Sequence, residues 1–354
     1  MSKPMEWPRY QLEIDEEGFP LFDGIRIDDV DFIKGLFQNF YLVDEKNPYS
    51  ALMSQCEGEN VLVKAFESPL VAQSVEAVNN EKSEWVFPGG MVFSVKHADL
   101  GVDEWNRVRA EIGPLKIFAS LSRKAQAAFG SRLSEMNLTL DLSPWYLEKT
   151  DERVENAEFW NQAYLRKKDG WEMREASPVL VHGWKEFRQK SQLKNGKAVV
   201  LGAGRGHDAR FVELNSSLEV TAVDFSNEAK TEFHKSYPDT RILYVCESAF
   251  DYLERNLKSF DVLVEHTFFC AISPQERRRY FQAVEHSLKE GGFLVGVFWM
   301  RPSRRGPPFG FTPWELRESL CKSNLEIIDF RLSPFSWENR WGQEYFVVLR
   351  KGKS

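Results

Sequence analysis

A glycine-rich segment at residues 201–206, spelled L-G-A-G-R-G, lies between an apolar run and a helical pattern that begins at His207. Its glycines permit a tight turn and close backbone approach to a ligand, and the following helix offers free N–H groups. NAD is bound by a G-x-G-x-x-G pattern, whereas this loop reads G-x-G-x-G and has His207 where the third glycine would stand. The spelling favours S-adenosylmethionine, which lacks a pyrophosphate, with Gly202 and Gly204 as binding residues.

Asp224 is the second candidate, because it ends the next predicted strand about 20 residues after the glycines. A carboxylate at this place can accept hydrogen bonds from both hydroxyls of a ribose, in NAD or in S-adenosylmethionine. In the alternative interpretation, Asp224 only caps the following helix, a role for which Ser226 competes. The glycine loop at the expected distance favours ribose binding.

The elements that must position these residues alternate between strand and helix in the C-terminal half. The pattern predicts strands over residues 198–201, 219–223, 241–246, 260–265, 293–299, 325–332 and 344–349. It predicts helices over residues 207–214, 227–236, 274–288 and 312–323. Such an order is typical of an α/β fold with a parallel, doubly wound sheet, and the closing pair of strands predicts an antiparallel hairpin at one edge. The arrangement resembles the Rossmann-like class I methyltransferase sheet.

The N-terminal half has an α+β pattern. We expect a hairpin over residues 12–27 and helices over residues 28–40 and 122–136, with strands over residues 61–66, 70–78, 85–87 and 91–95. The charge density rises near Thr150, which predicts an accessory domain over residues 1–150 and a methyltransferase domain over residues 151–354. The N-terminal half resembles a small bacterial domain family of unknown function through L-x-I at 12–14, Gly18, Gly24 and L-F at 36–37. It contains no catalytic constellation, and His97 is interpreted as structural.

A more specific resemblance covers roughly residues 155–350. The segments that carry it are F-W-N-Q-A-Y at 159–164, D-G-W-E at 169–172, S-P-V-L at 177–180, F-D-V-L-V-E-H-T-F-F-C-A-I at 260–272, G-P-P-F at 306–309 and T-P-W-E-L at 312–316. This combination resembles the thiopurine and thiol S-methyltransferase family, including its halide-methylating members. The resemblance implies an enzyme that moves a methyl group from S-adenosylmethionine to a small soft nucleophile, with a thiol as the expected acceptor.

The resemblance also implies site residues. It carries cofactor binding onto Trp160, Tyr164, Trp171, Gly202, Asp224, Ser248, Ala249 and His266. Trp160 and Tyr164 share a helix face, and aromatic faces attract a cationic sulfonium. In the alternative interpretation these aromatic residues are ordinary core. The family commonly has tryptophan where this chain has Tyr164 and tyrosine where it has His266.

His266 is the one catalytic candidate. It follows the fourth predicted strand of the large sheet, and its unperturbed pKa near neutrality suits a base that deprotonates a thiol. It can equally be a passive wall of the pocket or a hydrogen-bonded core residue, and both interpretations stay open. Phe268, Phe269 and Phe309 are candidates for the substrate pocket, with core packing as their alternative.

Composition excludes several other classes. The chain of 354 residues has 46 basic and 53 acidic residues, a net charge of −7, which argues against a nucleic-acid-binding protein. It contains no apolar run long enough for a membrane span, and its four cysteines form no C-x-x-C pair that would suggest a zinc site. We therefore expect a cytoplasmic enzyme with a small-molecule substrate and no metal. Three alternatives remain: transfer to an oxygen, nitrogen or protein acceptor chosen by the N-terminal domain, a cofactor-binding regulatory module without turnover, and an NAD oxidoreductase.

Overall fold

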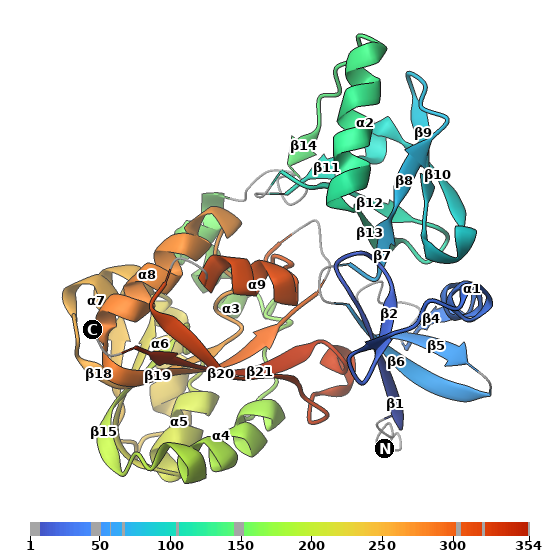
Figure 1. Ribbon diagram of the computed structural model, residues 1–354. Helices are drawn as coiled ribbons and strands as arrows, with labels where there is room; N and C mark the ends of the chain where they lie inside the picture. The colour runs from blue at the N-terminus through green and yellow to red at the C-terminus, as the bar shows by residue number, and fades with distance from the viewer. Residues whose placement is uncertain are drawn as a thin grey trace.

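The computed structural model describes residues 8–43, 51–56, 58–65, 68–103, 106–144, 152–301, 306–320 and 323–352. Within these residues the strands form four sheets, of which three are built from residues 10–144 and one from residues 195–351. Figure 1 shows the blue-to-green N-terminal elements at one side of the yellow-to-red elements that form the large sheet. We call residues 8–144 the N-terminal region.

The large sheet has seven strands in the order β17-β16-β15-β18-β19-β21-β20. Their bounds are β15 Asn195–Leu201, β16 Ser217–Asp224, β17 Leu243–Cys246, β18 Phe260–His266, β19 Leu288–Trp299, β20 Leu325–Leu332 and β21 Glu344–Lys351. The first five run parallel, while β21 pairs antiparallel with both β19 and β20. The predicted α/β sheet with an antiparallel edge hairpin is therefore confirmed, although several strands begin earlier than expected.

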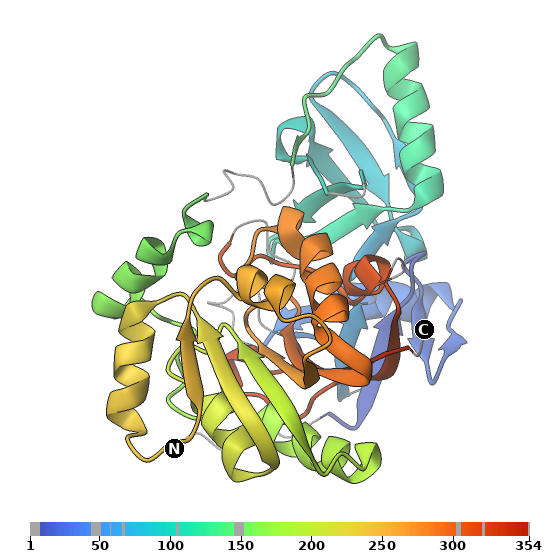
Figure 2. The same ribbon diagram turned by 90° about the vertical axis from the view of Figure 1, so that its left-hand side faces the viewer.

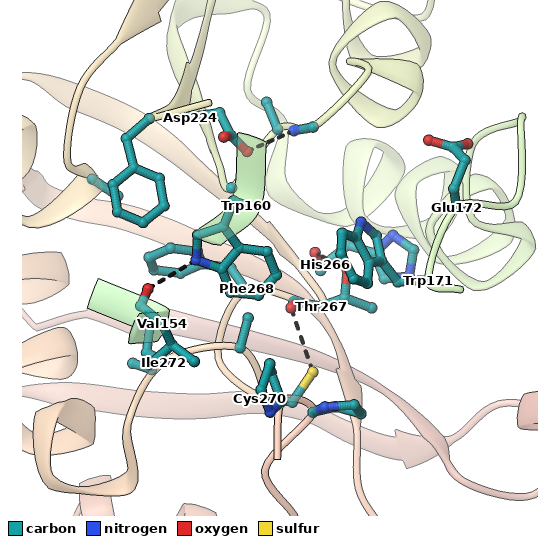
Figure 3. Close-up of a pocket in the computed structure, with 18 of the residues that line it drawn as sticks. Val154, Trp160, Trp171, Glu172, Asp224, His266, Thr267, Phe268, Cys270 and Ile272 are labelled. Atoms are coloured by element: carbon teal, nitrogen blue, oxygen red, sulfur yellow. Dashed lines mark hydrogen bonds between the residues drawn. The ribbon is translucent and has the colours of Figure 1, made fainter. Parts of the chain in front are cut away.

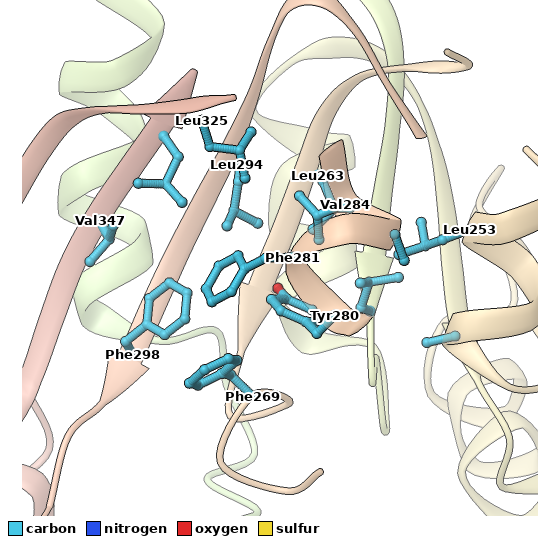
Figure 4. Close-up of a cluster of buried hydrophobic side chains, with 14 of the residues drawn as sticks. Leu253, Leu263, Phe269, Tyr280, Phe281, Val284, Leu294, Phe298, Leu325 and Val347 are labelled. Carbon is cyan, nitrogen blue, oxygen red and sulfur yellow. The ribbon is translucent and has the colours of Figure 1, made fainter. Parts of the chain in front are cut away.

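Helices cover both faces of this sheet. Their bounds are α3 Ala157–Leu165, α4 Pro178–Ser191, α5 His207–Leu214, α6 Asn227–Ser236, α7 Ala249–Arg255, α8 Arg277–Ser287 and α9 Pro313–Leu320. Successive strand residues point to opposite faces, so Leu201 packs in the core under α7, α8 and α9, and Val200 packs in the core under α4, α5 and α6. Figure 4 shows Tyr280, Phe281 and Val284 of α8 packed in the first of these cores.

In the described residues of the N-terminal region, three small sheets combine with two α-helices and two 3-10 helices. The sheet orders are β3-β2-β1-β6-β5-β4, β10-β9-β8 and β14-β11-β12-β13-β7. The strands are β1 Tyr10–Ile14, β2 Pro20–Phe22, β3 Ile25–Arg26, β4 Phe40–Leu42, β5 Leu52–Cys56, β6 Glu59–Ala65, β7 Leu70–Ala72, β8 Ser74–Glu76, β9 Lys82–Val86, β10 Val92–Lys96, β11 Gly101–Val102, β12 Val108–Ile112, β13 Ile117–Leu121 and β14 Ser143–Pro144. The α-helices are α1 Val30–Gln38 and α2 Arg123–Glu135, and the 3-10 helices of the chain are η1 Pro88–Gly90, η2 His97–Asp99, η3 Glu152–Glu155, η4 Pro274–Glu276 and η5 Glu338–Arg340.

One N-terminal strand prediction is wrong. The sequence predicts a continuous strand over residues 70–78, but the structure divides it at Gln73 into β7 and β8. β7 pairs with β13, whereas β8 pairs with β9 in a different sheet. A period of two in the sequence does not reveal that the chain passes from one sheet to another.

The N-terminal region contacts the C-terminal half through a small apolar cluster. Ala51, Met53 and Leu62 pack there against Leu332 and Trp341, which flank the connection between β20 and β21. Figure 2, turned from Figure 1, shows the N-terminal strands behind the large sheet. The predicted boundary near residue 150 lies outside the described residues, so the division into two domains stays a prediction. Among the described residues, none of the helices has both the length and the apolar character that a membrane crossing requires.

Candidate functional site

The predicted site residues all line one cavity. It has a volume of about 660 Å³ and includes residues at the carboxyl ends of β15, β16 and β18, where open α/β sheets bind their ligands. The nine predicted residues in its wall are Trp160, Tyr164, Trp171, Gly202, Gly204, Asp224, Ser248, Ala249 and His266. Figure 3 shows Trp160, Trp171, Asp224 and His266 around this space. The structure brings these residues together, and their individual roles stay predictions.

Two glycines fix the shape of the loop after β15. Gly202 and Gly204 have φ of +55° and +51°, a backbone conformation that residues with a side chain rarely adopt. A Cβ on Gly202 would lie 2.6 Å from the ring of Phe268, and a Cβ on Gly204 would lie 2.8 Å from the hydroxyl of Tyr164. The Tyr244 hydroxyl donates to the Gly204 carbonyl at 2.7 Å. The loop backbone is thus held in the wall of the cavity.

Asp224 is the last residue of β16. Its Oδ2 accepts the Gly204 N–H and its Oδ1 accepts the Ser226 N–H, both at 2.9 Å. The helix cap is Ser226, whose hydroxyl oxygen accepts the Ala229 N–H. Burial raises the pKa of Asp224, and the two backbone hydrogen bonds oppose that shift. Because a carboxylate has about four lone-pair sites, Asp224 retains acceptor capacity toward the cavity.

The start of α7 offers a further binding surface. Ser248 precedes the helix, and among the described residues no side chain caps its first turn. The first N–H groups of a helix have no partner within the helix. The rings of Phe250 and Phe268, 6.2 Å apart, also line the cavity. Backbone donors beside aromatic faces suit a flat heterocycle such as adenine.

An aromatic cluster covers another side of the cavity. Trp171 lies 5.3 Å from Trp160 and 5.8 Å from Tyr164 between ring centroids, in edge-to-face geometry. The Trp160 indole N–H donates to the Val154 carbonyl at 2.8 Å. The predicted helix face of Trp160 and Tyr164 is present in α3. The three rings pack on one another and also face the cavity, so the core and binding interpretations are both compatible with their positions.

Arg205 links this aromatic cluster to the glycine loop. Its Nη1 lies 2.6 Å from Asp169 and 2.9 Å from Glu172, and its Nε bonds Glu232. Burial acts to raise the pKa of Glu172, but hydrogen bonds from His207 and Arg205 outweigh it and lower that pKa to about 2. The ion pairs therefore hold the 169–172 loop, which carries Trp171, against the cavity.

Replacing Arg205 by methionine should weaken binding of S-adenosylhomocysteine about threefold to tenfold, or roughly 0.7–1.4 kcal/mol. Without the ion pairs, the 169–172 loop must be ordered at the moment of binding, which costs conformational entropy. The matched control is Arg210→Met, which also removes an arginine paired with two carboxylates, Glu213 and Asp239. Titration calorimetry measures both variants, and equal losses would contradict a specific role for Arg205.

His266 is held on both sides of its ring. Its Nδ1 lies 2.6 Å from Oδ2 of Asp208, and its Nε2 faces Oε1 of Glu344 at 3.8 Å and Nη1 of Arg340 at 3.2 Å. Arg340 and Glu344 are both fully buried and form an ion pair at 3.3 Å. With a protonated imidazole, two positive and two negative groups balance in this cluster.

The base role predicted for His266 is not supported by this environment. Burial acts to lower the pKa of His266, but the Asp208 charge and hydrogen bonds to Asp208 and Glu344 raise it overall to about 9. An imidazolium has no lone pair with which to accept a proton. The raised pKa favours a protonated imidazole at neutral pH although the Arg340 charge opposes it, and the interpretation as a hydrogen-bonded wall of the cavity fits the contacts of His266 better.

The turn after β18 is shaped by a buried carboxyl group. Glu265 accepts the backbone N–H groups of Phe268 and Phe269, and the Tyr280 hydroxyl donates to it at 3.3 Å. Burial raises the pKa of Glu265 to about 7. Phe268 lines the cavity, whereas Phe269 and Phe309 are about 1% exposed and belong to the core. Of the three phenylalanines named as pocket candidates, only Phe268 meets that prediction.

Sequence reasoning did not identify Asp208, Trp299 or Trp337 as residues of the cavity wall. Asp208 and His266 are 58 residues apart in the sequence, so no local sequence pattern indicates that they form a pair. The only available signal for Asp208 is an acidic residue in the first turn of a helix that follows the glycine loop. Trp337 lies in the connection before β21, outside any predicted element, and its ring stacks on His266 with centroids 5.8 Å apart.

Comparison with known proteins decides the family. The sequence pattern of the thiopurine S-methyltransferase family matches residues 155–333. The chain belongs to this family. It is 26% identical over 200 residues to a probable thiol methyltransferase 2 of Arabidopsis thaliana, covering 55% of this chain and 85% of that protein. It is 29% identical over 229 residues to thiopurine S-methyltransferase of Bos taurus, covering 56% of this chain and 90% of that protein.

Family membership makes the chain an S-adenosylmethionine-dependent methyltransferase. A solved methyltransferase of Burkholderia thailandensis with S-adenosylhomocysteine bound aligns with a TM-score of 0.46 at 16% identity, covering 72% of this chain and all of that one. The cavity has groups that fit the cofactor: a carboxylate with free acceptor sites at Asp224, backbone donors at α7 and aromatic faces. Membership of this methyltransferase family, rather than these groups, excludes the NAD alternative.

Proposed function

We propose that the enzyme methylates small thiols that enter the cavity as thiolates. The observation that supports this most directly is that the ionisable groups inside the cavity already have partners. Six acids and histidines that line it and are not exposed are paired as follows: Glu172 with Arg205, His207 with Tyr237, Asp208 with His266, Asp224 with Gly204, His266 with Asp208, and Glu276 with Arg279. A nucleophile that enters with its own negative charge needs no proton transfer to any of these groups.

The apolar part of the cavity favours a soft nucleophile over a hard one. Ile272, Trp299, Pro307 and Trp337 line the cavity, and the ring of Trp337 stacks on His266. A thiolate is weakly hydrated and polarizable, so it tolerates such surroundings better than an alkoxide or a carboxylate does. The related proteins are named for thiol, thiocyanate and thiopurine acceptors, all of which present sulfur. Thiocyanate is the second candidate, because it is an anion that needs no base.

Cofactor binding is assigned to the predicted residues. Asp224 accepts hydrogen bonds from the ribose hydroxyls, and Ser248 and Ala249 lie at the adenine. To that side we add Phe268, which the sequence analysis names for the substrate pocket. The aromatic rings of Trp160, Tyr164 and Trp171 cover the sulfonium side. When bound, S-adenosylmethionine supplies an electrophilic methyl group on a positively charged sulfur.

The chain contributes alignment to the reaction. The ring of His266, fixed by Asp208 and Arg340, forms a rigid wall for the acceptor at the end of β18, and the aromatic wall excludes water around it. Holding a nucleophile in line with the methyl group converts an encounter in solution into a positioned reaction, which can supply several kcal/mol of the barrier reduction. Cys270 takes no part as a base or nucleophile, because burial raises the pKa of its thiol to about 12.

Turnover of thiols with different acidity tests this proposal. At pH 7 an alkyl thiol of pKa about 8.5 is only a few per cent thiolate, whereas an aryl thiol of pKa below 6 is almost fully ionised. We expect kcat/KM for the alkyl thiol to rise about tenfold per pH unit between pH 6 and 8, and kcat/KM for the aryl thiol to stay level. Methylated product is quantified by mass spectrometry with S-adenosylmethionine at saturation.

Two outcomes would count against the proposal. Level profiles for both thiols would mean that the enzyme itself removes the proton. Methylation of alcohols or amines, with none of any thiol or of thiocyanate, would favour the alternative in which another acceptor is used. A chain that binds S-adenosylhomocysteine but methylates no acceptor would favour the regulatory module.

A further inference from the structure

We propose that the N-terminal region positions the acceptor end of the cavity, with Arg109, Leu62 and Glu315 as positioning residues. This inference rests on the proposed function only in that it assumes an acceptor beside His266. The cofactor contacts assigned above come from the glycine loop after β15, the end of β16, the turn after β18, α3, the 169–172 loop and the start of α7. We therefore place the acceptor beside the remaining segments of the wall, which carry Pro307, Pro308 and Trp337. The N-terminal region reaches both of those segments.

The first contact is a buried cluster of ion pairs. Asp103 lies 2.6 Å from Nη2 of Arg107 and 2.6 Å from Nη2 of Arg109. The same two nitrogens lie 3.2 Å and 3.1 Å from Oε1 of Glu315, in α9. The Arg109 side chain is fully buried, and the guanidinium of Arg107 lies 3.7 Å from the ring centroid of Trp314. The pairs thus join the N-terminal region to the first turn of α9.

The Glu315 side chain also caps the first turn of α9. Its Oε2 accepts the Thr312 N–H at 2.6 Å, while the Thr312 hydroxyl oxygen accepts the Glu315 N–H at 3.2 Å. This reciprocal pair is a capping box, which fixes where the helix begins. The chain just before it carries Phe309, whose N–H donates to the Cys270 carbonyl at 2.6 Å, and Pro307 and Pro308 in the cavity wall. One carboxylate therefore connects the two arginines to the segment that borders the acceptor space.

The second contact reaches the connection between β20 and β21. Trp341 packs against Leu62 in the apolar cluster described above, and a Cβ on Gly342 would lie 2.5 Å from the Cβ of Ala51. In Figure 1 this red connection lies next to the blue strands of the N-terminal region. The same connection holds Trp337, which lines the cavity, and Arg340, which donates to the Trp171 carbonyl at 2.8 Å. Displacement of the connection would move the wall around His266.

The ion pairs of the first contact are better suited to fix the position of α9 than to stabilise the contact between the N-terminal region and the C-terminal half. A buried ion pair gains little stability over apolar packing, because both charges lose their hydration. Its geometry is nevertheless narrow, since removal of one partner leaves a buried charge uncompensated. Two arginines on one carboxylate oxygen therefore define the place of α9 more sharply than an apolar contact would.

The test compares neighbouring residues of β6 in the full-length chain. Leu62 faces Trp341, whereas Val63 on the opposite face of the strand packs into the core of the N-terminal region. We expect Leu62→Ala to lower kcat/KM for an aryl thiol by about tenfold, because small misplacements of reacting groups are costly. The affinity for S-adenosylhomocysteine should change less than twofold. The matched control, Val63→Ala, should leave both quantities within twofold of the wild type.

Glu315→Gln provides the second variant, and amide hydrogen exchange provides a readout independent of turnover. Faster exchange at residues 306–316 is expected for Glu315→Gln, and faster exchange at residues 337–343 for Leu62→Ala, but neither for Val63→Ala. Unchanged exchange in both variants, or faster exchange without loss of kcat/KM, would overturn the proposal. If the wild-type chain methylates no thiol, the proposed function is contradicted but this inference is not. Hydrogen exchange, and turnover of other acceptors, would still test whether the N-terminal region positions the acceptor end of the cavity.

Discussion

Replacement of His266 by phenylalanine is expected to destabilise the folded protein by about 3–5 kcal/mol at neutral pH, because the variant leaves buried carboxylates without a counter-charge. Asp208 and Glu344 both face the imidazolium, and Arg340 alone would then have to compensate them. The loss in the free energy of unfolding should be larger than the loss that a change in packing alone would cause. A base role predicts instead a loss of rate with little change in stability.

The pH dependence of this effect has a definite sign. The pKa of His266 is raised from its ordinary value of 6.5 to about 9 in the folded protein, against the effect of burial, mainly by the Asp208 charge. Its contribution to stability is therefore fully present below pH 6.5 and is lost as the pH rises through about 9. The difference between the wild type and His266→Phe should be largest near pH 6 and should shrink by pH 9.5.

Urea unfolding at pH 6, 7.5 and 9.5 measures these differences. His286→Phe is the matched control, because His286 is exposed near the end of α8, away from the cavity wall, and its replacement should change stability by less than about 0.5 kcal/mol. A difference that is constant with pH would mean that His266 is neutral in the folded protein. That result would reopen the base role, which thiol turnover against pH in the wild type would then decide.

The parts of the site that lie in one short segment could be predicted from the sequence. Gly202 and Gly204 follow a strand within a few residues, and Asp224 ends the next strand, so strand order alone puts them at one edge of the sheet. His266 was placed at the end of its strand for the same reason. These predictions need only the alternation of strand and helix.

The charge state of His266 could not be predicted in this way. It depends on Asp208 in α5 and on Arg340 and Glu344 near β21, and these residues meet only in the folded chain. Burial and the neighbouring charges act on the pKa in opposite directions, so its net direction requires the actual distances. An unperturbed histidine leaves the base role and the passive roles equally open, and the raised pKa in the folded protein disfavours the base role.

The start of α4 has a local sequence signal, although the sequence analysis predicts no helix there. Ser177 caps this helix and Pro178 occupies its first turn, a combination typical of a helix start. The segment was read only as part of the family resemblance. By contrast, α7 spans only Ala249–Arg255, which is too short for a helical period to stand out. The sequence analysis also lacks β12 and β13, although Val108–Ile112 alternates apolar and charged residues and Ile117–Leu121 is largely apolar.

Replacement of Asp224 by alanine is expected to weaken binding of S-adenosylhomocysteine tenfold to a hundredfold. Hydrogen bonds to a charged group contribute about 1.5–3 kcal/mol, which corresponds to that range of affinity. Part of the loss will be indirect, because Asp224 also accepts the Gly204 N–H and so holds the glycine loop. Asp224→Asn narrows the comparison, since its one amide oxygen can still accept the Gly204 N–H, whereas the amide nitrogen that replaces the other oxygen accepts neither the Ser226 N–H nor a ribose hydroxyl.

Calorimetric titration with S-adenosylhomocysteine measures the three proteins. We expect Asp224→Asn to lose about tenfold in affinity and Asp224→Ala to lose more. The control is Asp239→Ala, which removes an exposed carboxylate that pairs with Arg210. If both Asp224 variants bind S-adenosylhomocysteine as tightly as the wild type, Asp224 does not bind the ribose. An intact affinity in Asp224→Asn with a loss in Asp224→Ala would mean that this carboxylate acts by holding the loop, and that the ribose hydroxyls bind elsewhere in the cavity.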